Sequence, residues 1–199
     1  MENTMQYLKK EIKDRILAAA VEEFKEQGYA DASIRNIANN AEISLGNIYR
    51  YFTNKEALYF AVINPFMESV KQFVENDFSF TNKTMKEVSE TLVSFLMQYN
   101  DELIIICKGN TVHYGDFVGY ITKAIATKIK ELIQSVFPEI DSKIQNPDFY
   151  TAVAEGFLTS LFRILKNGDS RETQERKTRE LVTFYFGHMK GRFENLDVD

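Results

Sequence analysis

The sequence predicts an all-α protein of about nine helices, in which a small N-terminal domain precedes a larger helical one. Three observations predict this fold class. Apolar residues recur three and four positions apart along most of the chain, as they do on one face of a helix. Residues that cap helices, and Gly or Pro residues that end them, separate these runs. No stretch shows the apolar–polar alternation that is typical of a half-buried strand.

Composition narrows the class of protein. The chain has 199 residues, of which 44% are hydrophobic, so it can form one domain or two small ones. Its unbroken apolar runs, such as Leu103–Cys107, are too short to cross a bilayer, and its charged N-terminus is unlike a signal peptide. The single Cys107 excludes an internal disulfide and suits a reducing cytosol. We therefore expect a cytoplasmic protein without a membrane partner.

The first predicted helix runs from about Met5 to Gln27. Its apolar side chains form one stripe, and Gly28 suits the left-handed residue that ends many helices. The members of the stripe are Ile12, Ile16, Leu17, Ala20, Val21 and Phe24.

The next stretch, Ser33 to Leu58, predicts two short helices joined by a tight turn. Ile34, Ile37, Ala38 and Ala41 line one face of the first helix. After a break at residues 42–43, Ser44 can cap a second helix over about Leu45–Tyr51. That helix contributes little to a core and leaves most of its side chains facing outward. Two such helices form the helix-turn-helix arrangement, whose second helix enters the DNA major groove.

A longer helix is expected after this pair. Thr53 to Glu56 fits a capping box with Thr53 at the cap, and Lys55 lies in the first turn, where a cation opposes the helix dipole. A nearby phosphate would explain that placement. Pro65 should kink or break the helix. We expect the domain boundary near this point, with domains spanning residues 1–61 and 62–199.

The second domain reads as helix throughout. Thr84 opens a capping box, a short apolar helix covers 101–108, and 109–115 reads as a loop or broken helix. A striped helix follows over 117–136 and ends at Pro138. Asn146 and Pro147 should open a helix to about Lys166, and Ser170 should cap a last helix to about Phe193.

The last two helices carry more apolar surface than one core-facing side needs. The simplest explanation is that one stripe packs within the chain and the other packs against a second copy. A larger core within one chain is the alternative. The predicted homodimer interface comprises Phe157, Leu161, Phe162, Leu181, Tyr185, His188 and Met189.

The helix-turn-helix stretch resembles the DNA-binding domain of the TetR family of transcriptional regulators over roughly the first sixty residues. The resemblance rests on the following residues: Ile37, Ala38, Ala41, Ile43, Ser44, Gly46, Ile48 to Phe52, Lys55, Glu56 and Leu58. It implies a dimer that binds double-stranded operator DNA and a second domain that encloses a small-molecule effector. Leu45 departs from the family, where a polar or basic residue is frequent. The expected DNA-binding residues are Ser33, Arg35, Ser44, Leu45, Gly46, Asn47, Tyr49, Arg50, Tyr51 and Lys55.

Charge qualifies this expectation. The net charge is −5, and residues 1–60 carry slightly more acidic than basic side chains. Between Ser33 and Phe60 the balance is locally positive, with Arg35, Arg50 and Lys55 against Glu42 and Glu56. Because phosphate contacts dominate affinity for DNA, we expect a monomer to bind weakly and a dimer to bind well.

The effector site is predicted more loosely. Aromatic side chains with few polar groups line many pockets, although they also form ordinary cores. The candidates are Phe95, Tyr99, His113, Tyr114, Phe117 and Tyr120. No metal-ligand spacing, glycine-rich phosphate loop or nucleophile–base pair is recognisable, so we expect no catalytic residues and no cofactor. A helical small-molecule-binding or scaffold protein that has lost DNA binding is the alternative function.

Overall fold

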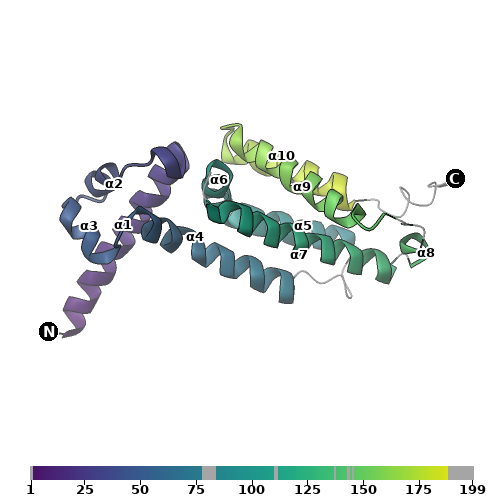
Figure 1. Cartoon of the computed structure of the whole chain (residues 1–199), viewed down its shortest axis with the longest axis horizontal. Helices are drawn as coiled ribbons and strands as arrows, with labels where there is room; N and C mark the ends of the chain where they lie inside the picture. The colour runs from purple at the N-terminus through teal and green to yellow at the C-terminus, as the bar shows by residue number, and fades with distance from the viewer. Residues whose placement is uncertain are drawn as a thin grey trace. The chain divides into compact units, whose positions relative to one another are not determined.

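The structure is a computed structural model that describes residues 2–77, 84–109, 112–136, 138–142, 144 and 146–187. Every regular element in the part of the chain so described is helical, which confirms the predicted fold class (Figure 1). The elements are α1 (Glu2–Asp31), α2 (Ile34–Asn40), α3 (Leu45–Tyr51), α4 (Lys55–Gln72), the π-helical η1 (Phe73–Asp77), α5 (Met85–Gln98), α6 (Asn100–Lys108), α7 (Val112–Val136), α8 (Pro138–Asp141), α9 (Phe149–Lys166) and α10 (Arg171–Phe186).

The chain divides into two compact units. The first unit consists of Met1–Glu68 and Asp101–Thr111, and the second of Ser69–Asn100 and Val112–Asp199. The chain therefore leaves the first unit within α4, returns to it as α6, and leaves it again before α7. The domain boundary predicted between residues 61 and 62 stays a prediction.

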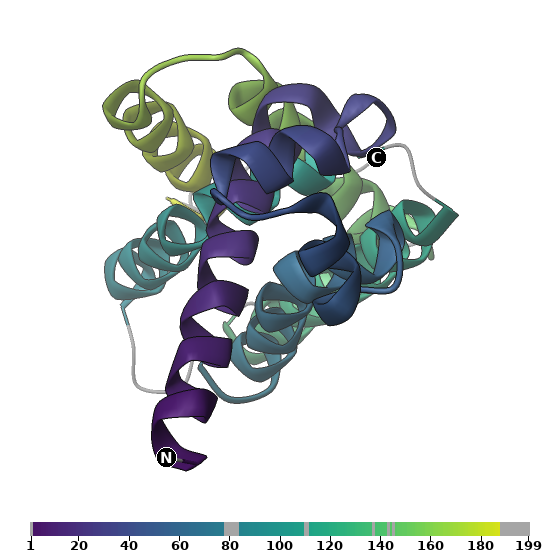
Figure 2. The same ribbon diagram turned by 90° about the vertical axis from the view of Figure 1, so that its left-hand side faces the viewer.

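In the first unit, α1 packs against α2, and α2 packs against α3 (Figure 2). Large apolar side chains from all four N-terminal helices form the core. Burial of these side chains stabilises each short helix, which could not persist alone in water. The most deeply buried are Ile16, Phe24, Ile37, Ile48 and Leu58, each with at most 1% of its surface exposed.

Two side chains of α1 hold the two ends of α2. The Glu23 carboxylate accepts hydrogen bonds from the Ser33 backbone N–H (2.8 Å) and the Asn36 side-chain amide (3.2 Å) at the start of α2. The Arg15 guanidinium donates to the Ala41 carbonyl (2.5 Å), just after α2 ends. The carboxylate thus lies at the positive end of the helix dipole and the guanidinium at the negative end. We call Arg15 and Glu23 the α1 clamp.

The course of α1 and α4 differs in detail from the sequence prediction. Gly28 adopts φ +74°, as expected for a residue that ends a helix, but one more helical turn follows it. The α4 helix begins at Lys55, and the Asn54 side chain accepts the Ala57 N–H (2.7 Å). Asn54 is therefore the cap, and the prediction that Thr53 caps this helix is wrong by one residue.

Proline does not end α4. The helix continues through Pro65 to Gln72 and passes into η1. Pro65 is exposed, so the hydrogen bond that proline cannot make is lost on a surface that water can reach. The predicted break at this position is therefore absent, and one continuous helix carries the chain from the first unit into the second.

The α6 helix packs at the end of α1. The Lys108 ammonium donates to the carbonyls of Lys25 (2.8 Å) and Glu26 (3.3 Å), just before the kink at Gly28. Lys25 also lies 3.5 Å from the Asp101 carboxylate at the other end of α6. These contacts place a helix from the middle of the sequence in the first unit.

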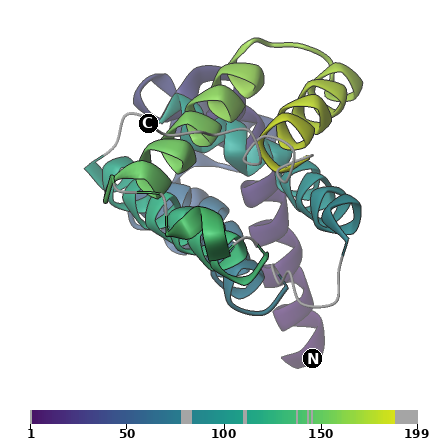
Figure 3. The ribbon, with the colours of Figure 1, turned by 90° about the vertical axis from the view of Figure 1, so that its right-hand side faces the viewer.

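The second unit is a layered helical bundle (Figure 3). The α9 helix packs against both α7 and α10, and α10 also packs against α5. Thr84 caps α5 in the predicted capping box, and Ser170 caps α10 as predicted. A buried polar contact joins Asn100 to Gln174 (3.1 Å), which satisfies both side chains away from water.

Two helix starts in this unit differ from the prediction. The α7 helix begins at Val112, so most of the stretch predicted as a loop over 109–115 is helical. The α9 helix begins at Phe149, because Asn146 caps a preceding turn by accepting the Asp148 N–H (2.9 Å). The predicted end of the last helix near Phe193 lies outside the described residues.

The α1 clamp generates a stability prediction. Replacing Glu23, which is 6% exposed, with Ala leaves the Ser33 N–H and the Asn36 amide without their acceptor. We expect Glu23→Ala to lower the free energy of unfolding by about 1–3 kcal/mol. Glu23→Gln retains an acceptor oxygen and should recover part of the loss. Urea denaturation measures both values.

The exposed Glu26→Ala on the same helix is the matched control, and we expect it to change stability by less than about 0.5 kcal/mol. Equal losses for Glu23→Ala and Glu26→Ala would show that the clamp does not stabilise α2.

Candidate nucleic-acid interface

The α3 helix buries little of its own surface. Ile48 is 1% exposed and anchors the helix, and Phe52 just beyond it is 6% exposed. Tyr49, by contrast, is 51% exposed, and Arg50 next to it also faces solvent. A helix of seven residues that keeps one buried anchor has most of its surface available to a partner.

Local geometry fixes where α3 starts. Glu42 in the turn adopts φ +54°, the left-handed conformation that reverses the chain direction between α2 and α3. The Ile43 N–H donates to the Ala38 carbonyl (3.0 Å), and Ser44 caps α3 by accepting the Asn47 N–H (3.3 Å). The Arg15 guanidinium also lies 3.3 Å from the Glu42 carboxylate, so the α1 clamp holds the turn itself.

The other α3 residues predicted to contact DNA are at least partly accessible. Gly46 and Ser44 are exposed, and Gly46 has open space where a side chain would project. Leu45, Asn47 and Tyr51 are half-buried. An approaching surface can therefore reach the backbone of α3 closely at Gly46 and meets side chains around it.

The two predicted residues around α2 have different environments. The Ser33 hydroxyl accepts the Asn36 N–H (3.4 Å) as the cap of α2, so it serves the fold. Arg35, two residues later, is exposed. Arg35 therefore offers an accessible cation for a phosphate, whereas the Ser33 hydroxyl is already used as the cap of α2.

Lys55 has an internal role that the sequence did not indicate. Its ammonium donates to the carbonyls of Ala30 (3.0 Å) and Ala32 (3.0 Å), and lies 4.9 Å from the centre of the Tyr29 ring. These contacts hold the connection between α1 and α2 against the start of α4. An ammonium has three N–H donors. Two are used here, so at most one remains for a phosphate.

An aromatic cluster supports this corner of the first unit. The Tyr59 ring contacts those of Phe24 (5.3 Å between centroids) and Tyr29 (5.0 Å). Burial removes water from the Tyr59 hydroxyl and raises its pKa to about 12, with smaller contributions from Tyr29 and Cys107. Tyr59 is therefore neutral at physiological pH and serves as a core residue.

Two residues that position α3 were absent from the sequence prediction, namely Arg15 and Glu23. A signal for Glu23 exists, because it follows Ile16, Ala19 and Ala20 at helical spacing and so lies within the apolar stripe. An acid in such a stripe is buried only when it has hydrogen-bonding partners. Arg15 has no comparable signal, because an arginine on an otherwise charged turn is ordinary.

The aromatic residues predicted for the effector site do not share one environment. Phe95 stacks on Phe73 (4.1 Å between centroids), Phe117 is buried, and Tyr120 is 44% exposed. The Tyr99 hydroxyl bonds to Ser69 (2.8 Å). His113 and Tyr114 belong to α7, but their side chains lie outside the described part of the structure. Their role in effector binding stays a prediction.

The predicted dimer residues fall into two groups. On α9, Phe157, Leu161 and Phe162 are 2%, 1% and 8% exposed because α7 and α10 cover both stripes of that helix. On α10, Leu181 and Tyr185 are half-buried. His188 and Met189 lie outside the described residues. Within the chain, α9 is thus covered on both stripes, and the part that these residues play in a dimer interface stays a prediction.

The described residues lack two other features. They contain no group of three or more His, Cys, Asp or Glu side chains that could hold a metal ion. Nor does any helix in those stretches have the length and apolar character required to span a membrane.

Known proteins resemble the chain in sequence. Residues 16–62 match the family described as bacterial regulatory proteins, tetR family. The chain is 29% identical over 173 residues to the fatty acid metabolism regulator protein of Bacillus subtilis, a match that covers 84% of this chain and 76% of that protein. It is 41% identical over 63 residues to the transcriptional regulator UidR of Escherichia coli, covering 32% of each.

Solved structures share the fold. A transcriptional regulator of the TerR/AcrR family from Aquifex aeolicus aligns with a TM-score of 0.61 at 22% identity, over 88% of this chain and 99% of that one. NalD, the secondary repressor of an efflux pump in Pseudomonas aeruginosa, aligns with a TM-score of 0.53 at 17% identity, over 90% and 98%. Together with the helix-turn-helix geometry, these matches show that residues 16–62 carry the DNA-binding domain of the TetR family of transcriptional regulators, and that the chain shares its fold with regulators of that family.

Proposed function

We propose that the protein is a homodimeric, ligand-responsive repressor that acts in the cytoplasm and binds a partly palindromic operator through α3. The observation that carries this proposal is the surface of α3, which leaves Tyr49 and Arg50 exposed while Ile48 alone anchors the helix deeply. Arg50 can donate to phosphate or to a base edge, and Tyr49 can donate to phosphate. A small effector bound in the second unit releases the operator.

In the proposed dimer, the two α3 helices together bind DNA more strongly than the single α3 helix of one chain does. The first sixty residues are slightly acidic, so one α3 helix with few cations gains little from phosphate neutralisation. Two copies on a two-fold axis present two such surfaces, about one turn of DNA (~34–36 Å) or a multiple of it apart. The operator should therefore consist of two related half-sites.

The α10 helix offers an accessible apolar surface for the second copy. Phe184 is 64% exposed, and the half-buried Leu181 and Tyr185 lie beside it on the helix. A large exposed aromatic side chain of this kind is typical of an interface residue. The buried stripes of α9 then support this surface from within.

Leu45 favours the second candidate, a TetR-fold protein that binds a small molecule but has lost DNA recognition. This half-buried apolar residue stands where a polar or basic side chain is frequent in the family. It can still contact a thymine methyl group, which is an apolar feature of the major groove.

Substitution on α3 separates these candidates. We expect Tyr49→Ala and Arg50→Ala each to weaken binding of the dimer to DNA from the protein's own promoter region by about a hundredfold, since each copy loses about tenfold, the size of one hydrogen bond to a charged group. Both side chains are exposed, so thermal stability should stay unchanged. Fluorescence anisotropy measures the affinity, and Tyr120→Ala, an exposed tyrosine of α7, is the matched control. Wild-type protein that fails to bind this DNA would favour the second candidate.

Lys55 provides a test of its two roles. Lys55→Met removes the bonds to Ala30 and Ala32, so the melting temperature should fall whether or not Lys55 contacts DNA. If its remaining N–H donor meets a phosphate, the slope of log K against log salt should also decrease in magnitude by about 1.8, or about 0.9 for each copy of the dimer. Titrations at several salt concentrations measure the slope. A lower melting temperature with an unchanged slope would make Lys55 a purely structural residue.

The dimer surface is tested at Phe184. Phe184→Asp places a charge in the proposed apolar contact and should shift the protein from dimer to monomer in analytical ultracentrifugation without lowering stability. Leu8→Asp is the control, since Leu8 is 51% exposed on α1. A Phe184→Asp protein that remains dimeric would place the interface elsewhere.

A further inference from the structure

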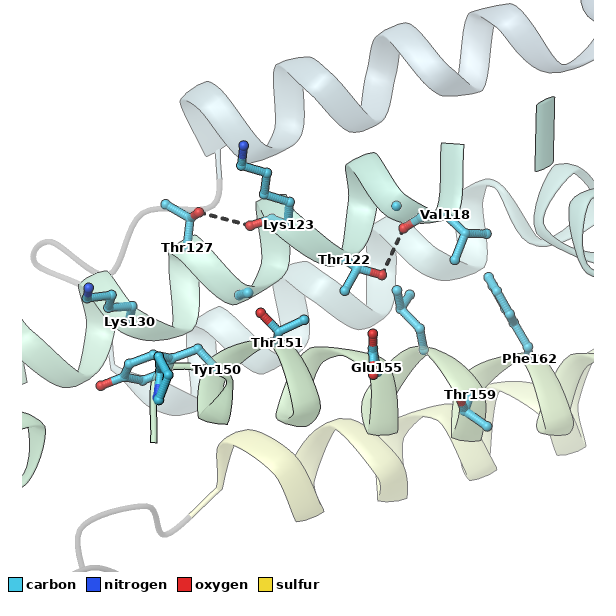
Figure 4. A pocket seen from close by; sticks show the side chains of 14 residues that line it. Val118, Thr122, Lys123, Thr127, Lys130, Tyr150, Thr151, Glu155, Thr159 and Phe162 are labelled. Atoms are coloured by element: carbon cyan, nitrogen blue, oxygen red, sulfur yellow. Dashed lines mark hydrogen bonds between the residues drawn. The ribbon is translucent and has the colours of Figure 1, made fainter. Parts of the chain in front are cut away.

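A groove of about 800 Å³ lies between α7 and α9 in the second unit, a volume that suits a small organic ligand (Figure 4). The residues predicted from sequence to bind the effector do not line it. On α7 the lining extends from Val118 to Lys130, twelve residues or about 18 Å of helix. Across from it, α9 contributes residues from Tyr150 to Phe162. The groove is thus long and narrow.

Its floor is largely apolar and already packed. Ala126, Leu158 and Phe162 are 7%, 5% and 8% exposed. Thr122 is also buried, but its hydroxyl donates to the Val118 carbonyl (2.8 Å). Its donor is therefore satisfied without a ligand. A molecule in the groove therefore rests on an apolar surface. The groove is open at Gly119 and Ala126 of α7 because these residues have small side chains or none.

The rim is polar, and its character changes along the groove. Val118 and Phe162 lie at one end, whereas Lys130 and Tyr150 lie at the other (Figure 4). Lys123 adds a second cation partway along, and Glu155 is the one acidic side chain among the lining residues. The groove therefore carries a positive excess in a chain of net charge −5.

A neighbouring carboxylate lies near the cationic end but is already hydrogen-bonded. Asp141 accepts from the Tyr150 hydroxyl (2.5 Å) and the Gln134 amide (3.1 Å). Those bonds, first of all that from Tyr150, hold the pKa of Asp141 below its usual value. Its charge also interacts with Lys130, so a second anion would have to share that lysine or use Lys123.

From this arrangement we propose that the α7–α9 groove binds an elongated anionic amphiphile. Its apolar body lies over Leu158 and Phe162, and its anionic head lies at the Lys130 end of the groove. A carboxylate and a phosphate head share this chemistry. Binding itself is independent of DNA, whereas the role of the molecule as the effector rests on the proposed function.

Gly119 allows the groove to be filled without disturbing the fold. A side chain added at Gly119 would meet nothing within 4 Å, and the same is true of Gly115, one turn earlier on α7 and outside the groove. Gly119→Phe therefore blocks the site, and Gly115→Phe is its matched control. Both replacements remove a helix-interior glycine, so neither should reduce helix stability.

The binding test uses dodecanoate, dodecyl phosphate, dodecanol and dodecyltrimethylammonium below their micellar concentrations, titrated into the full-length protein by calorimetry. We expect one dodecanoate per chain, bound about tenfold more tightly than dodecanol and more tightly still than the cation. Gly119→Phe should abolish this binding, and Gly115→Phe should retain it. Comparison of dodecyl phosphate with dodecanoate shows whether the groove prefers a phosphate or a carboxylate head group.

Charge substitutions on the rim test the position of the head. A protein carrying both Lys123→Gln and Lys130→Gln should bind dodecanoate no better than dodecanol, whereas Glu155→Gln should tighten dodecanoate binding by removing a like charge. Equal binding by wild type and Gly119→Phe, or no preference among the four head groups, would overturn the proposal. A Gly119→Phe protein that loses dimerisation would also overturn it, because a second copy would then occupy the groove.

Dependence on the proposed function is tested separately. Adding dodecanoate to the protein–DNA complex should lower the anisotropy of labelled operator DNA for wild type and Gly115→Phe, but not for Gly119→Phe. Dodecanoate that binds in the groove without releasing DNA would uphold the site and refute its effector role. Absence of DNA binding in any condition would refute the proposed function and leave the calorimetric result standing.

Discussion

The first unit depends on the α1 clamp. Arg15 and Glu23 are eight residues apart, about 12 Å along α1, and α2 with its seven residues is about 10.5 Å long. One helix can therefore hold both ends of the other with side chains of opposite charge. The carboxylate meets the free N–H groups of α2 and the guanidinium meets its terminal carbonyl, so each charge also agrees with the helix dipole.

This arrangement explains how such short helices can have fixed positions. Neither α2 nor α3 is long enough to form on its own. Ile37 and Ala38 attach α2 to the core, whereas Ile48 is the one buried residue of α3. The clamp adds directional bonds at both ends of α2 and at the turn that follows it. Since α3 starts two residues after that turn, the contact of Arg15 with Glu42 acts close to its first residue, while Ile48 and the packing on α2 hold the helix itself.

Most of the first unit could be read from the sequence because local chemistry decides it. The bounds of α3 and its Ser44 cap follow from side chains within three residues of one another. The cap of α4 was misplaced because Thr53 and Asn54 are both good caps, and only the packed position of the helix selects Asn54. The clamp spans 26 residues between Arg15 and Ala41, a separation at which sequence spacing carries no information.

The second unit was less predictable for a related reason. Two apolar stripes on α9 indicate that two surfaces cover the helix, but not whether the second belongs to the same chain. Here α7 and α10 of the same chain pack against α9. The large apolar side chain left exposed on α10 is Phe184. The α7–α9 groove has no sequence signature either, because Gly119 and Ala126 create a space only when α9 packs beside them.

The position of α6 constrains how the two units can communicate. Lys108 and Lys25 tie α6 to the end of α1, yet its neighbours in sequence, α5 and α7, belong to the second unit. The chain therefore crosses between the units on both sides of α6 as well as within α4. Within the first unit, contacts link α6 to α1 through Lys108, and α1 in turn to both ends of α2 and to the turn before α3.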